Sequence, residues 1–382
     1  MHNKSERIQN IIVPIIAVIL GFVLGGLIML GFGFNPIEGY GQMFKTAFLN
    51  PLTGEVNPRN IGEIFVSAAP LIFTALGFSI ANTAGFFNIG LSGQALCGWV
   101  TSIWIALSMP DAPRFVVLLV AIVAGVLSGA IAGAIPGFLR AFFGTSEVIV
   151  TIMMNYILLH IGNHIVNNVM SPKIIQSKGM TVAINKSASL QTPWLAALTN
   201  NSRLNLGIFF AIIALVVVWF VMKKTTLGYE IRAVGLNPYA SEYAGMSSKR
   251  TIIVSMVISG ALAGMGGVIL GLGTFENFTS QSSSLAIGFD GMAVSLLGNG
   301  SSLGIFAAAL LFSVLQLGGQ GMQVVGIPSE LVNIDIAIII FFVGISFVIR
   351  YVLAKLTGKK AATVKVEKDS KPNEESQEGG TI

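Results

Sequence analysis

The chain has 382 residues, of which 53% are hydrophobic and only 10% are charged, and its mean hydropathy is +0.79. Soluble domains carry about 25% charged residues, so this composition excludes an ordinary soluble protein and predicts an integral membrane protein in a lipid bilayer. The one cysteine, Cys97, excludes a disulfide framework and a cysteine-based metal cluster. The formal charge of +5 predicts no nucleic-acid partner, because the Lys and Arg residues lie in loops and near the C-terminus, as the positive-inside rule places them.

Apolar segments that approach the roughly 20 residues needed to cross a bilayer recur along the chain. They predict an all-α, polytopic transmembrane protein of about ten spans. The first segment follows Lys4 and Arg7 and has no small-residue cleavage site, so we interpret it as a retained span and not as a signal peptide. The segments are 11–33, 62–82, 94–109, 115–138, 147–166, 204–222, 252–272, 286–299, 303–318 and 331–350.

Ten crossings with a cytosolic N-terminus place the polar loop 223–250 and the C-terminus in the cytosol as well. We expect residues 1–355 to form one transmembrane domain. From Lys359 onward Lys alternates with Asp and Glu, so residues 356–382 are expected to be a disordered cytosolic tail.

Two halves of five spans each carry similar short sequences. Ser146-Glu147 opens the fifth span and Ser329-Glu330 the tenth, while Gly85-Phe86 and Gly288-Phe289 mark two short spans that glycines are expected to break. Halves of five crossings must run in opposite directions, which predicts the inverted 5+5 repeat of many transporters. The alternative is that Ser-Glu is simply a good helix start in both places.

Glycines recur every fourth residue in the fourth span, at Gly125, Gly129, Gly133 and Gly137. This spacing puts them on one face of a helix and predicts close packing against a second helix.

Polar residues at membrane depth predict a solute pathway. In GFFNIGLSGQALCGW, residues 85–99, aromatic rings lie beside amide and hydroxyl groups, a mixture that suits an uncharged, hydrogen-bonding, ring-bearing solute. The alternative is a helix contact in which these groups satisfy broken backbone. The candidate pathway residues are Phe86, Phe87, Asn88, Ser92, Gln94, Asn155, Asp290 and Asn299.

Acidic residues within the spans leave a second mechanism open. Glu147, Asp290 and Asp335 would be costly if they faced lipid, and they are candidates for a proton path in a proton-coupled secondary transporter.

The loop 223–250 contains a short helix with its own start and stop signals. Asn237 is a favourable N-cap, Pro238 suits the first helical position and Gly245 can end the helix in a left-handed conformation. A simple connection needs no capped helix, so this one is expected to be a docking surface. The sequence has no Gly-x4-Gly-Lys-Ser/Thr phosphate loop and no catalytic motif, so the chain is expected to be no enzyme and to bind no cofactor or metal; any ATPase must be another polypeptide.

Four motifs together resemble one family. They are GFFNIGLSGQ at 85–94, SEVIVTIMMNY at 146–156, GYEIRAVGLNPYASEYAGM at 228–246 and GFDGMAVSLLGNG at 288–300. They are similar to the membrane permeases of ABC importers in the branched-chain amino-acid/ribose permease superfamily, and within it most of all to the permease subunits of bacterial nucleoside importers. The resemblance extends over nearly all of residues 8–355.

The resemblance implies a nucleoside importer subunit in the cell membrane, with sugars or amino acids as alternative cargo. It implies three partners: a second, homologous permease, a cytosolic ATPase that uses ATP, and an extracellular nucleoside-binding lipoprotein. It also implies that the ATPase contacts this chain through a coupling segment. The residues that it assigns to that segment are Gly228, Arg232, Gly235, Asn237, Pro238, Ala240, Tyr243 and Gly245.

Overall fold

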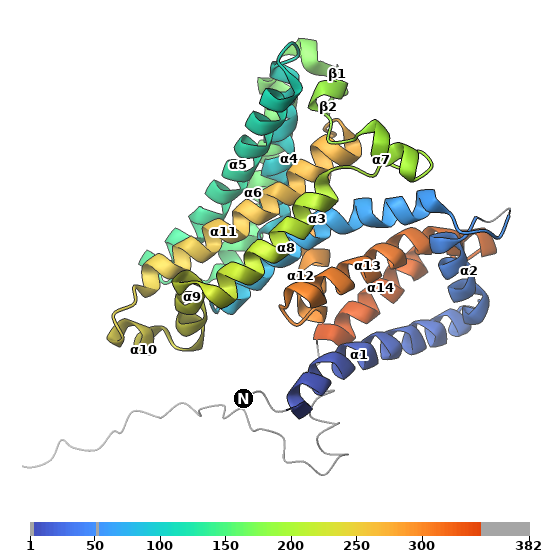
Figure 1. Ribbon diagram of the computed structural model, residues 1–382, viewed down its shortest axis with the longest axis horizontal. Coiled ribbons are helices and arrows are strands. Elements are labelled where there is room, and N and C mark those ends of the chain that lie inside the picture. The colour runs from blue at the N-terminus through green and yellow to red at the C-terminus, as the bar shows by residue number, and fades with distance from the viewer. Residues whose placement is uncertain (1–3, 51–52, 345–382) are drawn as a thin grey trace, which may run out of the picture.

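The computed structural model describes residues 4–50 and 53–344, and over these residues the chain is built almost entirely of helices (Figure 1). The all-α expectation is confirmed: the strands among the described residues are β1 (Ile175–Ser177) and β2 (Met180–Thr181), which pair as one short hairpin. The predicted tail and the end of the tenth predicted span lie outside the described residues.

Each of the ten predicted spans coincides with a helix. In the N-terminal half these are α1 (Lys4–Gly31), α3 (Pro58–Thr83), α4 (Leu91–Ser108), α5 (Arg114–Phe143) and α6 (Glu147–His164). In the C-terminal half they are α8 (Gly207–Lys224), α11 (Ser248–Ile269), α12 (Ala286–Leu297), α13 (Ser302–Met322) and α14 (Ser329–Gly344). Seven helical segments of the described chain are long and apolar enough to cross a membrane, so the chain is a multi-pass membrane protein.

The prediction that glycines break the third and eighth spans is wrong. α4 and α12 are continuous helices, and the irregular backbone lies before α4, between Ala84 and Gly90. The glycines inside these helices permit contact instead: Gly98 of α4 packs on the backbone of Gly264 in α11, and Gly288 of α12 packs on Ser92. Neighbouring helices thus compensate for the weak helix propensity of glycine.

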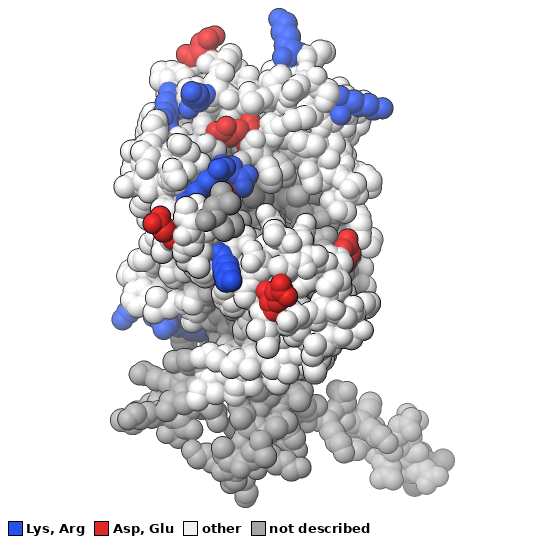
Figure 2. Space-filling model, turned by 90° about the vertical axis from the view of Figure 1, so that its right-hand side faces the viewer, with Lys and Arg blue, Asp and Glu red and all other residues white. Residues whose placement is uncertain are grey.

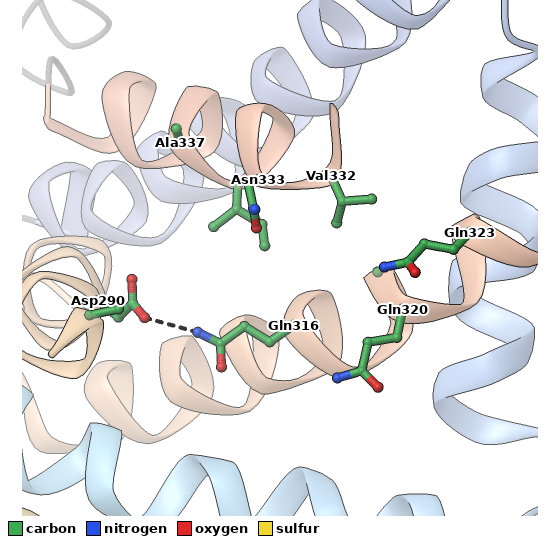
Figure 3. Close-up of a pocket in the computed structure, with 10 residues that line it drawn as sticks. Asp290, Gln316, Gln320, Gln323, Val332, Asn333 and Ala337 are labelled. Carbon is green, nitrogen blue, oxygen red and sulfur yellow. Dashed lines mark hydrogen bonds between the residues drawn. The ribbon is translucent and has the colours of Figure 1, made fainter. Parts of the chain in front are cut away.

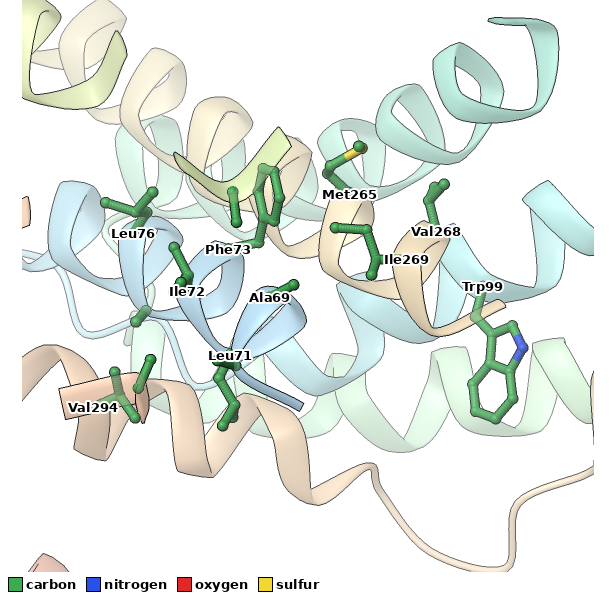
Figure 4. Close-up of a cluster of buried hydrophobic side chains, with 14 of the residues drawn as sticks. Ala69, Leu71, Ile72, Phe73, Leu76, Trp99, Met265, Val268, Ile269 and Val294 are labelled. Carbon is green, nitrogen blue, oxygen red and sulfur yellow. The ribbon is translucent and has the colours of Figure 1, made fainter. Parts of the chain in front are cut away.

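The core forms where α3 and α11 cross in the middle of the molecule (Figure 4). α3 is buried along most of its length, whereas α1, α5, α6 and α8 bury only one side and expose Leu, Ile, Val and Phe on the other, as lipid-facing helices do. The labelled core residues are Ala69, Leu71, Ile72, Phe73 and Leu76 of α3, Trp99 of α4, Met265, Val268 and Ile269 of α11, and Val294 of α12.

The glycine stripe of α5 packs against α11, as its spacing predicts. A methyl group on Gly129 would lie 2.6 Å from the Cα of Gly264, and one on Gly260 would lie 2.9 Å from the Cα of Gly133. The two backbones are therefore in direct contact, which only small residues allow.

One amphipathic helix, α2 (Pro36–Phe48), was not predicted. Asn35 caps it by accepting a hydrogen bond from Ile37 N–H (3.1 Å), and it buries Gly39, Met43 and Ala47, which are spaced four residues apart. At 13 residues it is too short to cross a bilayer, and a search for apolar runs misses it because only one face is apolar.

The long polar segment between α6 and α8 folds over the end of α11. It consists of η1 (Ile165–Val169), η2 (Pro172–Ile174), the β-hairpin, η3 (Lys186–Ala188) and α7 (Pro193–Leu198). Leu190 N–H donates to the carbonyl of Leu272, in the π-helical segment η4 (Leu270–Phe275) that extends α11. Viewed from the right-hand side of Figure 1, basic and acidic side chains are interspersed and form no patch of one sign (Figure 2).

Candidate functional site

The amide groups at the break before α4 are buried and hold the irregular backbone together. Asn88 donates from Nδ2 to Gln94 Oε1 (3.0 Å) and to Ser259 Oγ of α11 (2.9 Å). Its own Oδ1 accepts a hydrogen bond from Gly90 N–H (2.9 Å). These bonds pair polar groups that would otherwise be unsatisfied inside the membrane, so the geometry gives Asn88 and Gln94 a bracing role.

Asn155 of α6 fastens the same break from the other side. Its Oδ1 accepts from Gly93 N–H (2.8 Å), and its Nδ2 donates to the carbonyl of Ile89 (2.9 Å). Ser92 donates to the carbonyl of Leu285, the residue before α12 (2.7 Å). The structure thus brings four of the predicted pathway residues into one buried network that joins α4 to α6, α11 and α12.

The two phenylalanines of the break differ in exposure. Phe86 is buried, while Phe87 is partly exposed and lies edge-on to Phe78 with ring centroids 5.1 Å apart. Asn299 lies elsewhere, in the left-handed turn (φ 51°) between α12 and α13, at the edge of a mainly apolar groove between α1 and α13.

A cavity of about 480 Å³ opens between α12, α13 and α14 (Figure 3). Asp290 lies at one end of it and accepts a hydrogen bond at Oδ2 from Nε2 of Gln316 (2.9 Å). Figure 3 shows the other carboxylate oxygen turned away from Gln316. Further hydrogen-bonding side chains that line this cavity are Gln320, Gln323 and Asn333.

Sequence reasoning found Asp290 but missed the glutamines. They follow each other at intervals of four and three residues along α13 and its extension η5 (Gln323–Val325), which puts Gln316, Gln320 and Gln323 on one helix face. A polar stripe at helical spacing inside an otherwise apolar span is the signal that identifies such a surface. A row of amides at this depth requires cover by protein or water.

A second cavity, of about 400 Å³, adjoins the first at Ala286, a residue that lines both. It lies between α4, η4 and the start of α12. Trp99 and Phe275 contribute aromatic rings to its wall. The same wall carries the polar residues Asn277, Thr279 and Gln281.

The three acids considered for a proton path lie in separate environments. Glu147 pairs with Arg140 of α5 (Oε2–Nε 3.4 Å). Asp335 is buried beside Gly25 of α1 and Tyr40 of α2. Asp290 is the one of these three acids that lines either of the two adjoining cavities.

The predicted capped helix is present as α10 (Pro238–Tyr243). Asn237 Oδ1 accepts a hydrogen bond from Ala240 N–H (3.0 Å), and Gly245 has the left-handed φ of 84° that the sequence predicts. A further helix, α9 (Thr226–Leu236), precedes it and was not predicted. Both helices form one end of the molecule in Figure 1.

Large apolar or aromatic side chains are exposed on this end, among them Tyr229 of α9. Leu236 is 88% exposed, Tyr239 77% and Tyr243 96%. Gly228 packs α9 against the backbone of α8, and Gly235 packs it against the end of α3. Arg232, which lies between these two glycines in the sequence, is half-buried. The exposed residues therefore project from a segment that is fixed to the helix bundle.

Comparison with known proteins identifies relatives over nearly the whole length. Residues 60–344 match the family described as branched-chain amino acid transport system / permease component. The chain is 50% identical over 373 residues to the nucleoside ABC transporter permease protein NupB of Lactococcus lactis, covering 97% of this chain and 100% of that protein.

Two more relatives are informative. The guanosine ABC transporter permease protein NupP of Bacillus subtilis is 43% identical over 93% of this chain and 99% of its own length. The nucleoside ABC transporter permease protein NupC of Lactococcus lactis is 25% identical over 71% of this chain and 86% of its own length. No solved structure shows significant similarity to the chain.

Proposed function

The chain belongs to the branched-chain amino acid transport system / permease component family, and from that premise we propose that it is the membrane-spanning subunit of an ABC importer for nucleosides. Two relatives that match it over more than nine-tenths of both lengths carry nucleoside and guanosine in their names, which supports this cargo. The subunit is a transporter component and not an enzyme.

The observation that carries the ATP-driven mechanism is the exposed surface of α9 and α10. Leu236 at the end of α9, and Tyr239 and Tyr243 on the capped helix α10, are large and mostly exposed side chains. Exposed apolar groups clustered on a rigid element are typical of a protein contact. We infer that a separate cytosolic ATPase docks on this surface. ATP then binds to that partner, and this chain itself binds no cofactor. The proposed coupling residues are Gly228, Arg232, Gly235, Asn237, Pro238, Ala240, Tyr243 and Gly245.

The proposed topology has ten crossings, with both termini in the cytosol and residues 1–355 as one domain. Lys223, Lys224, Lys249 and Arg250 flank the α9–α10 segment, and the positive-inside rule therefore supports a cytosolic position for it. The five spans of each half would form an inverted repeat.

The proposed partners are a second, homologous permease subunit and an extracellular nucleoside-binding lipoprotein. NupB and NupC of Lactococcus lactis are both named nucleoside ABC transporter permease proteins, and both match this chain, which supports a heterodimer. The partly open cavity lined by α12, α13 and α14 carries amides that a second permease would shield from lipid.

In this proposal the translocation path runs along the two adjoining cavities. Asp290 and Gln316 supply hydrogen-bonding groups to a passing solute. The buried residues Asn88, Ser92, Gln94 and Asn155 shape the inner part of the path by fixing the break before α4. Phe86, Phe87 and Asn299 line neither of the two cavities, and their place in the pathway rests on the sequence alone.

The test is uptake of radiolabelled guanosine into proteoliposomes that contain this chain with its co-purified partners. Uptake that requires internal ATP supports the proposal, and uptake driven by a proton gradient without ATP contradicts it. The double variant Tyr239→Ala/Tyr243→Ala is expected to lose the ATPase on purification. The control is Leu198→Ala in α7, which removes another large exposed side chain at a different site and is expected to retain the ATPase. Retention of the ATPase by the double variant would contradict the docking surface.

A further inference from the structure

We propose that the exposed face of Phe275 is a stacking surface for the base ring of the nucleoside, in the cavity next to the one that contains Asp290. This inference rests on the proposed function and adds to it the part of the path that recognises the base. It is carried by the geometry of Trp99, Phe275 and the backbone that holds them.

The two rings form a fixed stack with one open side. Their centroids are 5.0 Å apart and their planes differ by 17°. Trp99 is only 4% exposed, whereas Phe275 is 50% exposed. Trp99 therefore covers one face of Phe275, and the other face is available to a planar ligand.

The ring of Trp99 is held from two further sides. Its Nε1 donates a hydrogen bond to the carbonyl of Asn277 (2.9 Å), and Phe278 lies against it edge-on, with ring centroids 5.1 Å apart. A methyl group on Gly271 would lie 2.7 Å from Cδ1 of Trp99, so the indole fits here because residue 271 has no side chain. These contacts position the indole before a ligand arrives, and such preorganisation lowers the entropy cost of binding.

The segment that carries Phe275 is also held in place. η4 is a π-helix, a form that is frequent at functional sites, and it ends at Glu276, a residue with a left-handed φ of 57°. Glu276 accepts a hydrogen bond from Ser189 Oγ, and its carbonyl accepts one from Ile184 N–H. The segment 180–190 thus fixes the far end of η4.

The polar groups around the aromatic pair suit the edge of a base. Asn277, Thr279 and Gln281 line the same cavity, and the backbone of Gln281 is fixed by Asn163, which donates to its carbonyl (2.7 Å) and accepts from its N–H (3.0 Å). Ala286 connects this cavity to the one that contains Asp290 and Gln316. A nucleoside, with an aromatic ring joined to a polyhydroxylated sugar, matches an aromatic cavity that adjoins a polar one, whereas a free sugar has no group for Phe275.

The test uses the purified importer complex with 8-azidoadenosine as a photoactivated probe, and with excess Mg-ADP to occupy the ATPase. Labelled peptides are identified by mass spectrometry. Label is expected within residues 270–287, and excess guanosine but not excess ribose should remove it. Phe275→Ala and Phe275→Leu should each lower this label about tenfold, the scale of losing one base–aromatic stack, while Phe275→Tyr retains it.

The matched control is Phe289→Ala, since Phe289 is 48% exposed and lines neither of the two cavities. It should be labelled as the unmodified protein is. Undiminished labelling in Phe275→Leu, or labelling confined to other segments while guanosine is imported, overturns the stacking surface and leaves the proposed function intact. A complex that neither imports guanosine nor takes up the probe overturns both.

Discussion

Gly235, near the end of α9, lies directly against the backbone carbonyl of Thr83, the last residue of α3. Two residues further on, Gly85 adopts a φ of 85° and also faces Gly235. The segment that carries the exposed surface of α10 is therefore in contact with the break before α4. In the proposed mechanism, a displacement of α9 and α10 would be transmitted through these backbone contacts to the start of the pathway.

The first prediction concerns that contact. Gly235→Ala places a methyl group against Thr83 where no space exists, and overpacking of this kind costs about 1–3 kcal/mol. We expect α9 to be displaced and ATP-dependent uptake to fall about tenfold while the ATPase still co-purifies. Gly41→Ala in α2 is the control, because a methyl group there meets no atom within 4 Å. Normal uptake by Gly235→Ala would show that this contact does not transmit the motion.

The second prediction concerns the charge in the cavity shown in Figure 3. Asp290→Asn keeps the shape of the side chain but weakens any hydrogen bond that it accepts from a solute hydroxyl, and hydrogen bonds to charged groups contribute about 1.5–3 kcal/mol. We expect the maximal uptake rate to fall about tenfold. The ATPase should remain bound.

The control removes one negative charge elsewhere. Asp111→Asn alters an exposed residue in the connection between α4 and α5, outside both cavities, and is expected to transport normally. If Asp290→Asn and Asp111→Asn transport equally well, Asp290 does not contact the solute.

The third prediction concerns the ion pair between Glu63 of α3 and Arg203, in the segment that precedes α8. Arg203 donates from Nη2 and Nε to the carboxylate of Glu63 (2.7 and 3.1 Å), and Glu63 is buried. Arg203→Ala removes the charge-assisted hydrogen bonds from the guanidinium to Glu63 but keeps the one from the backbone N–H of residue 203. Hydrogen bonds to charged groups contribute about 1.5–3 kcal/mol. Thermal unfolding of the purified protein should therefore shift to lower temperature. Arg59→Ala removes an exposed arginine from the same helix α3 and should unfold as the unmodified protein does; an equal shift in both variants would refute the pair's role.

The fourth prediction separates bracing from solute contact at Asn155. Asn155→Ala leaves Gly93 N–H and the carbonyl of Ile89 unpaired and buried, at about 1–3 kcal/mol for each group. We expect a lower unfolding temperature, with uptake reduced in proportion to the amount of folded protein. Asn168→Ala, an exposed change in η1, should alter neither. Unchanged stability with poor uptake per folded molecule would assign Asn155 to the pathway instead.

The sequence predicted individual features well where the cause lies within one or two helical turns, as in helix capping and the spacing of small residues. Asn237 and Gly245 delimit α10 because N-caps and left-handed C-terminal residues act within one turn. Gly129 and Gly133 predicted a close helix contact because the spacing of small residues is itself the interface. The partner helix, α11, could not be predicted, since nothing local specifies which helix fills the groove.

Residues of the candidate site were harder to predict because polarity alone does not distinguish bracing from lining. Asn88 and Gln316 are both amides in apolar surroundings, yet one is buried in a network and the other borders a cavity. The difference depends on which helices surround each side chain.

The sequence by itself determined that the chain crosses the membrane many times, where its long apolar helices lie and that the polar loop 223–250 contains a capped helix. These properties follow from hydrophobicity and capping, which act over a few turns. Only the tertiary structure decided that Gly235 meets Thr83, that Trp99 supports Phe275 and that the aromatic and polar cavities adjoin at Ala286. Contacts between residues far apart in the chain depend on how helices pack, and packing is a property of the whole bundle.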